Sequence, residues 1–235
     1  MVKLKRKQAG LGYSLIGLFL VTVGLFNGAL ISGFRMAPFV VTLGTMSMAR
    51  SLAIVVTGAN QVTVKGCSAE ASFRALAWAD TLGVPNPVWL MALAVLAGHV
   101  FLCYTRTGRH IYYIGANAEA ARLSGLHVTA IRWMVFTLCG LMAGLAGIVQ
   151  ASRIAIGQPS AGAGDELRVI AAVIIGGASF SGGVGTALGS LLGAAIMGVL
   201  RQGLILLGVE PNWQQFVEGA VIIGAVGLDL LRKRK

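Results

Sequence analysis

Charged residues are scarce in this chain of 235 residues. They make up 11% of it, whereas 56% of the residues are hydrophobic, and the mean hydropathy is +0.80. A soluble domain of this length carries about a quarter charged residues, because its surface faces water. This shortage excludes a water-facing surface around the whole chain. The sequence therefore predicts an all-α membrane protein, a polytopic bundle of transmembrane helices that forms a single domain over residues 1–235.

Residue patterns for covalent chemistry are also missing. Cys67, Cys103 and Cys139 are far apart and have no C-x-x-C spacing, which argues against a disulfide scaffold or a zinc site. The three histidines show no metal-ligand spacing either. The phosphate-binding loop G-x-x-x-x-G-K-[ST] does not occur in the sequence. We therefore expect no catalytic residue, no metal and no cofactor in this chain.

Acidic residues are few, yet the resulting basic excess does not indicate nucleic-acid binding. There are 19 lysines and arginines against 8 acidic residues, a net charge of +11. The cations lie between long apolar runs and at both ends of the chain, rather than on one face. This pattern is typical of cytoplasmic loops beside anionic lipid. The predicted partner is the lipid bilayer, and no nucleic acid.

Long apolar runs supply the candidate membrane spans, since a helix needs about 20 apolar residues to cross the hydrocarbon. Seven runs qualify, and we expect about six or seven spans. The fifth and sixth runs are short and separated only by Ser181–Gly183, so they are either half-helices or a tight hairpin at the membrane surface. The runs are roughly Leu11–Ile31, Ala37–Thr57, Val88–Tyr104, Trp133–Ala151, Leu167–Phe180, Val184–Leu200 and Trp213–Leu231.

The charges of the connections indicate an orientation. Residues 105–132 contain four arginines against one glutamate, the strongest cytoplasmic signal in the chain. Residues 58–87 are balanced in charge and residues 152–166 end in two acidic side chains, so both are predicted outside. The basic tail, residues 232–235, belongs in the cytoplasm. Seven spans would then place the basic flank of residues 1–10 outside, which conflicts with the positive-inside rule and leaves the orientation of the first span open.

The cytoplasmic loop contains a stretch of the form E-A-A-x-x-x-G, from Glu119 to Gly125. Asn117 suits the N-cap of a short helix, Glu119 favours the helix N-terminus, and Gly125 suits its end. Such a helix outside the bilayer is a compact knob that fits a groove on a partner protein. On the residues alone, an ordinary surface helix in a loop is as good an interpretation of this stretch as a docking helix.

This loop resembles the cytoplasmic motif of permease subunits in binding-protein-dependent ATP-binding-cassette importers. Further stretches resemble the ribose/xylose/arabinose/galactose-type permeases over about residues 20–231. Each stretch alone is a weak signal, whereas their order along the chain is specific. The stretches are Pro38–Gly44, Thr107–Tyr112, Gly115–Asn117, Ala121–Gly125, Gly162–Gly164, Ala171–Gly177, Ser181–Gly185 and Gly203–Gly208.

The resemblance implies a permease subunit in the bacterial inner membrane that imports a monosaccharide. A cytoplasmic ATP-binding subunit would bind and hydrolyse the ATP. A second permease copy or homologue and an external sugar-binding protein would complete the assembly. Residues 105–132 would be the coupling loop, with the ATPase-coupling residues Gly115, Asn117, Glu119, Ala120, Ala121, Ser124 and Gly125.

A departure from the family pattern at the N-terminus keeps alternatives open. Permeases of this type have about ten spans and an early segment that this chain lacks, so the chain resembles a permease that is short at its N-terminus, and an incomplete, non-functional permease is one alternative. A secondary transporter is another. It would be expected to carry buried acidic residues for ion coupling, and only Asp229 lies near a span end.

Polar residues and glycines within the spans are the remaining candidates. Arg50 falls near the middle of the second span, where it either lines the sugar path or pairs with a carbonyl in the bundle interior. Threonine and asparagine in a span serve helix packing as often as substrate binding. The candidates for the sugar path are Asn27, Thr42, Thr45 and Arg50. Glycines at four-residue spacing are interpreted as helix-packing seams rather than substrate contacts: Gly140 and Gly144, and Gly185, Gly189 and Gly193.

Overall fold

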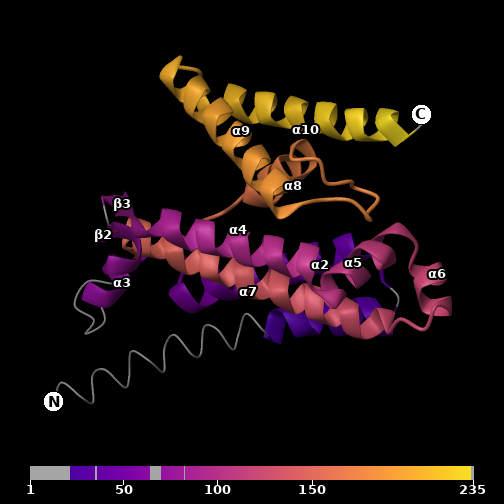
Figure 1. Ribbon diagram of the computed structural model, residues 1–235. Helices are drawn as coiled ribbons and strands as arrows, with labels where there is room; N and C mark the ends of the chain where they lie inside the picture. Colours follow the sequence, from indigo (N-terminus) through magenta and orange to yellow (C-terminus); the bar gives the residue numbers. More distant parts are fainter. Residues whose placement is uncertain (1–21, 35, 64–69, 82, 234–235) are drawn as a thin grey trace. The chain divides into compact units, whose positions relative to one another are not determined.

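The computed structural model describes residues 22–34, 36–63, 70–81 and 83–233, and α-helices dominate it (Figure 1). The basic flank of residues 1–10, the first part of the first predicted span, Arg35 and residues 234–235 of the tail lie outside the described residues. The chain forms two compact units. The first contains residues up to 91 together with 129–161, and the second contains residues 92–128 and those from 162 onward.

The first unit contains a helix of residues Thr22–Gly33 and most of the long helix α7. Its elements in chain order, after Thr22–Gly33, are α2 (Pro38–Thr57), β1 (Val62–Thr63), α3 (Glu70–Trp78), β2 (Asp80–Thr81), β3 (Val84–Pro85), the start of α4 (Asn86–Tyr104), α7 (Val128–Ile154) and β4 (Ile156–Gly157). The second unit contains the rest of α4, then α5 (Arg106–Ala116), α6 (Ala118–Leu123), α8 (Asp165–Ile175), α9 (Ala187–Leu206) and α10 (Pro211–Lys233).

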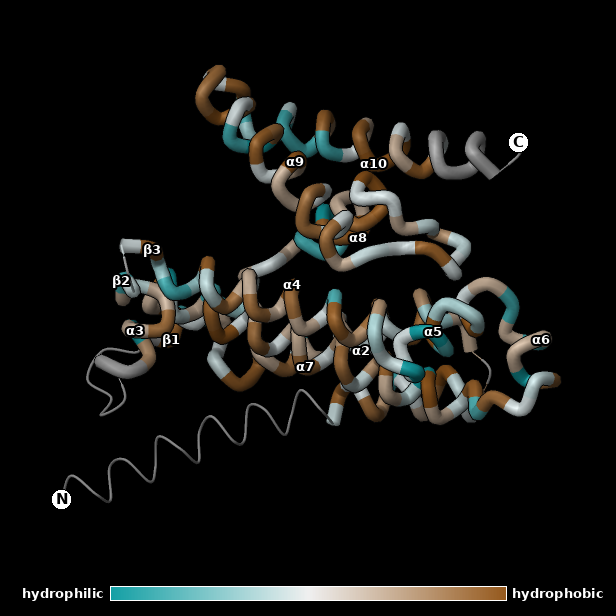
Figure 2. Tube along the Cα trace, in the orientation of Figure 1, coloured by the Kyte–Doolittle hydropathy of each residue, from teal (hydrophilic) through white to brown (hydrophobic). Residues whose placement is uncertain are grey.

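Four of the described helices are long and apolar enough to cross a membrane, namely α2, α4, α7 and α9. In Figure 2 apolar residues predominate along α9, whereas hydrophilic residues gather on α5 and α6. Large apolar side chains point outward from the helices; Val55 is 76% exposed and Val199 is 73% exposed. Water would penalise these surfaces, whereas lipid tails accept them. The predicted all-α membrane class is therefore confirmed.

The structure differs from the sequence-based expectation in three segments. The fifth predicted span is α8, a helix of 11 residues. At 1.5 Å per residue it extends about 16 Å, half of the roughly 30 Å of hydrocarbon, so the half-helix alternative describes it. Residues 58–87, predicted as a loop, contain α3, and residues 105–132 contain α5 in addition to the predicted short helix, which is α6. Because α3 and α5 are short and contain charged residues, they give no long apolar run, and the hydropathy pattern therefore missed them.

In the first unit, the helix Thr22–Gly33 packs closely on α7. A Cβ at Gly24 would lie 2.7 Å from the carbonyl oxygen of Phe136, and one at Gly28 would lie 3.1 Å from the Cα of Trp133. Only glycine allows the two backbones to approach this closely. The same helix face contains Ile31, which is 2% exposed.

Two connections predicted outside the membrane, residues 58–87 and the first part of residues 152–166, contact each other within the first unit. β1 pairs antiparallel with β4, with Val62 opposite Gly157. The fully buried hydroxyl of Ser152 donates a hydrogen bond of 2.5 Å to the carbonyl oxygen of Phe73. These contacts join residues 58–87 to residues 152–166, consistent with their predicted placement on one side of the membrane.

In the second unit, α8 and α9 form an antiparallel hairpin (Figure 1). A Cβ at Gly189 would overlap the carbonyl oxygen of Gly176, and one at Gly193 would overlap that of Ala172. The glycines of α9 therefore lie directly on the backbone of α8. A small core of Ala171, Ala172 and Met197 fills the hairpin, with Ile175, Val221 and Ile222 packed against it.

Candidate functional site

The site is built on α5, which folds back on the end of α4. Thr105 caps α5: its hydroxyl oxygen accepts a hydrogen bond of 3.0 Å from the N–H of Gly108. The same hydroxyl donates to the carbonyl oxygen of Phe101 at 2.6 Å. A Cβ at Gly108 would overlap the Phe101 oxygen, so the sharp return of the chain requires glycine there.

The predicted short helix is α6, and the predicted cap is in place. The side-chain oxygen of Asn117 accepts hydrogen bonds of 3.0 Å from the N–H groups of Glu119 and Ala120. This satisfies two donors that otherwise have no partner in the first turn. The side chains of Glu119 and Arg122 form an ion pair of 2.8 Å and are 67% and 62% exposed. In the solvent such a pair contributes little to stability, so these charges are available to a partner protein.

The end of α6 also follows the sequence prediction. Gly125 has φ +83°, a left-handed conformation that favours glycine. The N–H of Leu126 then donates back to the carbonyl oxygen of Ala121 at 3.1 Å. The hydroxyl of Ser124 donates to the carbonyl oxygen of Ala120 at 2.9 Å. These bonds close the C-terminal end of a compact six-residue helix.

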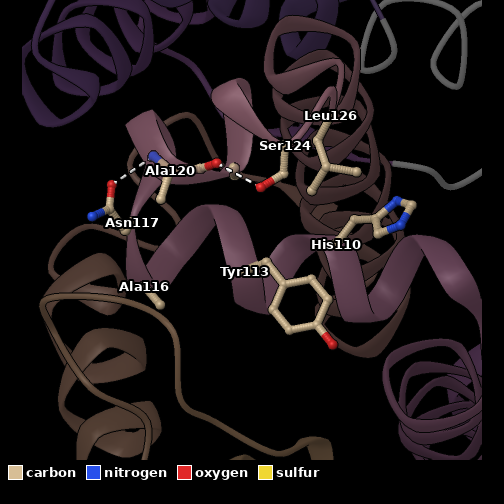
Figure 3. Close-up of a pocket in the computed structure, with 8 residues that line it drawn as sticks. His110, Tyr113, Ala116, Asn117, Ala120, Ser124 and Leu126 are labelled. Carbon is tan, nitrogen blue, oxygen red and sulfur yellow. Dashed lines mark hydrogen bonds between the residues drawn. The ribbon is translucent and has the colours of Figure 1, made fainter.

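A groove of about 440 Å³ lies between α5 and α6 (Figure 3). Apolar side chains and alanine faces make up most of its wall, and the polar groups of the α6 cap lie at its edge. Four of the seven predicted coupling residues line it, namely Asn117, Ala120, Ala121 and Ser124. Four further residues complete the wall: His110, Tyr113, Ala116 and Leu126.

Gly115, another predicted coupling residue, lies away from the groove wall, against the loop that joins α8 to α9. A Cβ at Gly115 would lie 2.5 Å from the backbone nitrogen of Gly183. One turn earlier, the hydroxyl of Tyr112 donates to the carbonyl oxygen of Gly185 at 2.6 Å. Burial raises the pKa of the Tyr112 hydroxyl above its usual range, so the group stays protonated and remains a donor at physiological pH.

The four candidates for a sugar path lie on two consecutive helices of the first unit. Asn27 is 9% exposed, and its side-chain oxygen has no hydrogen-bond partner within the described part of the chain. The hydroxyls of Thr42 and Thr45 donate to backbone carbonyls one turn earlier in α2. Arg50, also on α2, is half-buried. Of these, Asn27 has a polar atom left to be satisfied.

The similarity of the chain to known proteins shows its family. Residues 8–226 match the family described as "Branched-chain amino acid transport system / permease component". The chain belongs to this permease family. It is therefore an integral membrane protein, as its apolar helices indicate.

Individual relatives of the permease have sugars in their names. The chain is 42% identical over 207 residues to the ribose import permease protein of Escherichia coli (strain K12), which covers 88% of this chain and 64% of that protein. It is 44% identical over 203 residues to the ribose import permease protein of Bacillus subtilis (strain 168), covering 86% and 62% of the two chains. It is 46% identical over 156 residues to the xylose transport system permease protein of Escherichia coli (strain K12), covering 66% and 40%. No solved structure matches the permease significantly.

Sequence reasoning missed the contribution of α5 to the permease's groove. The sequence did carry a signal for the helix itself, because Ile111 and Ile114 are three residues apart on one face, although neither isoleucine lines the groove. The glycine seam of the second unit was found: Gly185, Gly189 and Gly193 all approach residues of α8 or of the loop after it. In α7, Gly144 is buried and Gly140 is half-buried. Within the described residues, no group of three or more histidines, cysteines or acidic residues lies close enough to hold a metal ion.

Proposed function

We propose that the chain is the permease subunit of an importer that carries a monosaccharide across the bacterial inner membrane. The observation that carries the proposal is the 42% identity over 207 residues to a ribose import permease. The xylose relative supports the same substrate class. The description of the family names branched-chain amino acids, whereas these relatives favour a pentose.

ATP is hydrolysed on a separate cytoplasmic subunit, and α6 is the part of this chain that the subunit binds. The helix is capped at both ends, carries two exposed charges and flanks an apolar groove. Closure of the ATPase subunits moves α6 and shifts the permease between two states of access, because binding energy differs between those states. A second permease copy or homologue and an external sugar-binding protein complete the importer.

Asn27 is the best-supported residue for the sugar path. A buried amide oxygen without a partner costs about 1–3 kcal/mol, and a sugar hydroxyl would supply the missing donor. Thr42 and Thr45 already use their hydroxyl protons within α2, although each oxygen still accepts.

Capture and uptake test the proposal together. The tagged chain is purified from its own cells in mild detergent, and an ATP-binding-cassette subunit is identified by mass spectrometry. Uptake of labelled ribose, xylose and leucine is then measured in cells with and without the chain. We expect the ATPase subunit to copurify and pentose uptake to depend on the chain.

Glu119→Lys reverses an exposed charge on α6 and should abolish both capture and uptake without preventing membrane insertion. Glu210→Lys is the matched control, because it makes the same change at an exposed turn between α9 and α10. Leucine uptake in place of pentose uptake would contradict the substrate class. Equal capture by both variants would contradict docking on α6.

A further inference from the structure

The last turn of α5 makes a close backbone contact with the α8–α9 loop, defined here as residues 176–186. A Cβ at Gly115 would lie 2.5 Å from the backbone nitrogen of Gly183, and one at Gly182 would lie 2.6 Å from the carbonyl oxygen of Gly115. A Cβ at Gly183 would lie 3.0 Å from both carbon atoms Cα and Cβ of Ala116. The last turn of α5 therefore meets the loop backbone against backbone.

A hydrogen bond fastens this contact to the start of α9. Tyr112 donates to the carbonyl oxygen of Gly185 at 2.6 Å, and its side chain is half-buried. The next residue, Thr186, is the N-cap of α9 and accepts from the N–H of Gly189 at 3.0 Å. A movement of Tyr112 is thus applied to the first turn of α9.

The helices on the two sides of the contact between α5 and the α8–α9 loop have little room to absorb a displacement. On one side, Asn117 is both the C-cap of α5 and the N-cap of α6, so one residue separates the two helices. On the other side, α9 lies on the backbone of α8 through Gly189 and Gly193. Close-packed backbone has no side-chain rotamers that can yield, and it transmits strain.

We propose that Tyr112 and Gly115 are positioning residues that couple α6 to the α8–α9 hairpin. The inference rests on the proposed function, in which α6 receives the movement of the ATPase subunit. Tyr112 holds the loop by its hydrogen bond, and Gly115 allows the backbone contact that makes the connection stiff. The hairpin responds because α5, the α8–α9 loop and α9 move as one.

The test measures pentose uptake per ATP hydrolysed by the complete importer in proteoliposomes. Tyr112→Phe removes one oxygen atom, and Gly115→Ala adds one methyl group at the contact. The controls are Tyr104→Phe, at a tyrosine that is 75% exposed, and Gly198→Ala, where a Cβ meets nothing within 4 Å. We expect Tyr112→Phe to keep the ATPase subunit bound and to lower uptake per ATP by about fivefold or more, within the range of measured couplings between sites.

Three other outcomes would each contradict the coupling role of Tyr112, and one of them would also contradict the proposed function. If wild type takes up pentose and Tyr112→Phe has the same uptake per ATP, the coupling role is wrong and the proposed function stands. If Tyr112→Phe loses the ATPase subunit, or loses uptake and hydrolysis in parallel, its role is structural and the inference is wrong. If the wild-type chain binds no ATPase subunit, the proposed function and the inference fail together. Tyr112→Phe keeps the test decisive even where Gly115→Ala does not fold.

Discussion

The guanidinium of Arg168 bonds the carboxylate of Glu218 across two helices, with 2.7 Å between Nε and Oε2. Arg168 lies on α8 and Glu218 on α10, and their side chains are 24% and 8% exposed. A second guanidinium nitrogen of Arg168 donates to Asp165 at 2.8 Å, within α8. A buried charge is costly unless it is paired. The pair therefore fixes which faces of α8 and α10 meet.

Neutralising the buried partner should destabilise the protein. Glu218→Gln leaves the charge of Arg168 with Asp165 alone, and we expect a loss of about 3 kcal/mol in the free energy of unfolding. Asp165 is 54% exposed, so Asp165→Asn should cost less than about 1 kcal/mol. Unfolding in detergent micelles by titration with a denaturing detergent measures both. Equal losses in the two variants would mean that the pair does not hold the helices together.

The glycine seam of α9 gives a second prediction with a control on the same helix. A Cβ at Gly193 would overlap the carbonyl oxygen of Ala172, whereas one at Gly198 meets nothing within 4 Å. We expect Gly193→Ala to lower the free energy of unfolding by about 2 kcal/mol, as overpacking does. Gly198→Ala should be neutral or stabilising by up to about 1 kcal/mol, because alanine favours helix. The same unfolding titration checks both, and an intact Gly193→Ala protein with unchanged stability would disprove the contact.

Four of the seven predicted spans correspond to described helices that are long and apolar enough to cross a membrane, because crossing a bilayer imposes a length that a sequence shows directly. The cap and the end of α6 were also predictable, since Asn117 and Gly125 act within a few residues of themselves. The partner of Tyr112 was not, because Gly185 lies 73 residues away in the sequence. Glycine spacing in α9 indicated a seam, yet nothing local indicates that α8 lies against it. The ion pair of Arg168 and Glu218 was not predictable for the same reason, because the two residues are 50 positions apart. A sequence shows the sign of each charge, but not which charge it pairs with.

The cap of α6 gives a third prediction. Asn117→Ala leaves the N–H groups of Glu119 and Ala120 without their acceptor, at a cost of about 1 kcal/mol to the helix. We expect the variant to bind the ATPase subunit about fivefold more weakly, because α6 must be ordered on binding. Titration of the purified chain with its ATPase subunit measures this. Asn117→Asp retains the acceptor and should bind as wild type does; a loss of equal size in both variants would assign Asn117 to direct contact rather than to capping.

At Gly125, the last residue of the turn that ends α6, the backbone conformation limits substitution, whereas the space around the residue does not. A Cβ at Gly125 meets nothing within 4 Å, so the constraint there is its φ of +83°. Proline fixes φ near −65°, and Gly125→Pro must therefore turn the chain elsewhere and break the return from α6 into α7. We expect this variant to insert in the membrane, as a fluorescent fusion or protease protection reports, while pentose uptake is abolished. Gly125→Asn is the matched control, because asparagine adopts positive φ more readily than other side chains, and it should retain most of the uptake. Uptake that survives Gly125→Pro would show that the shape of α6 is not needed for transport.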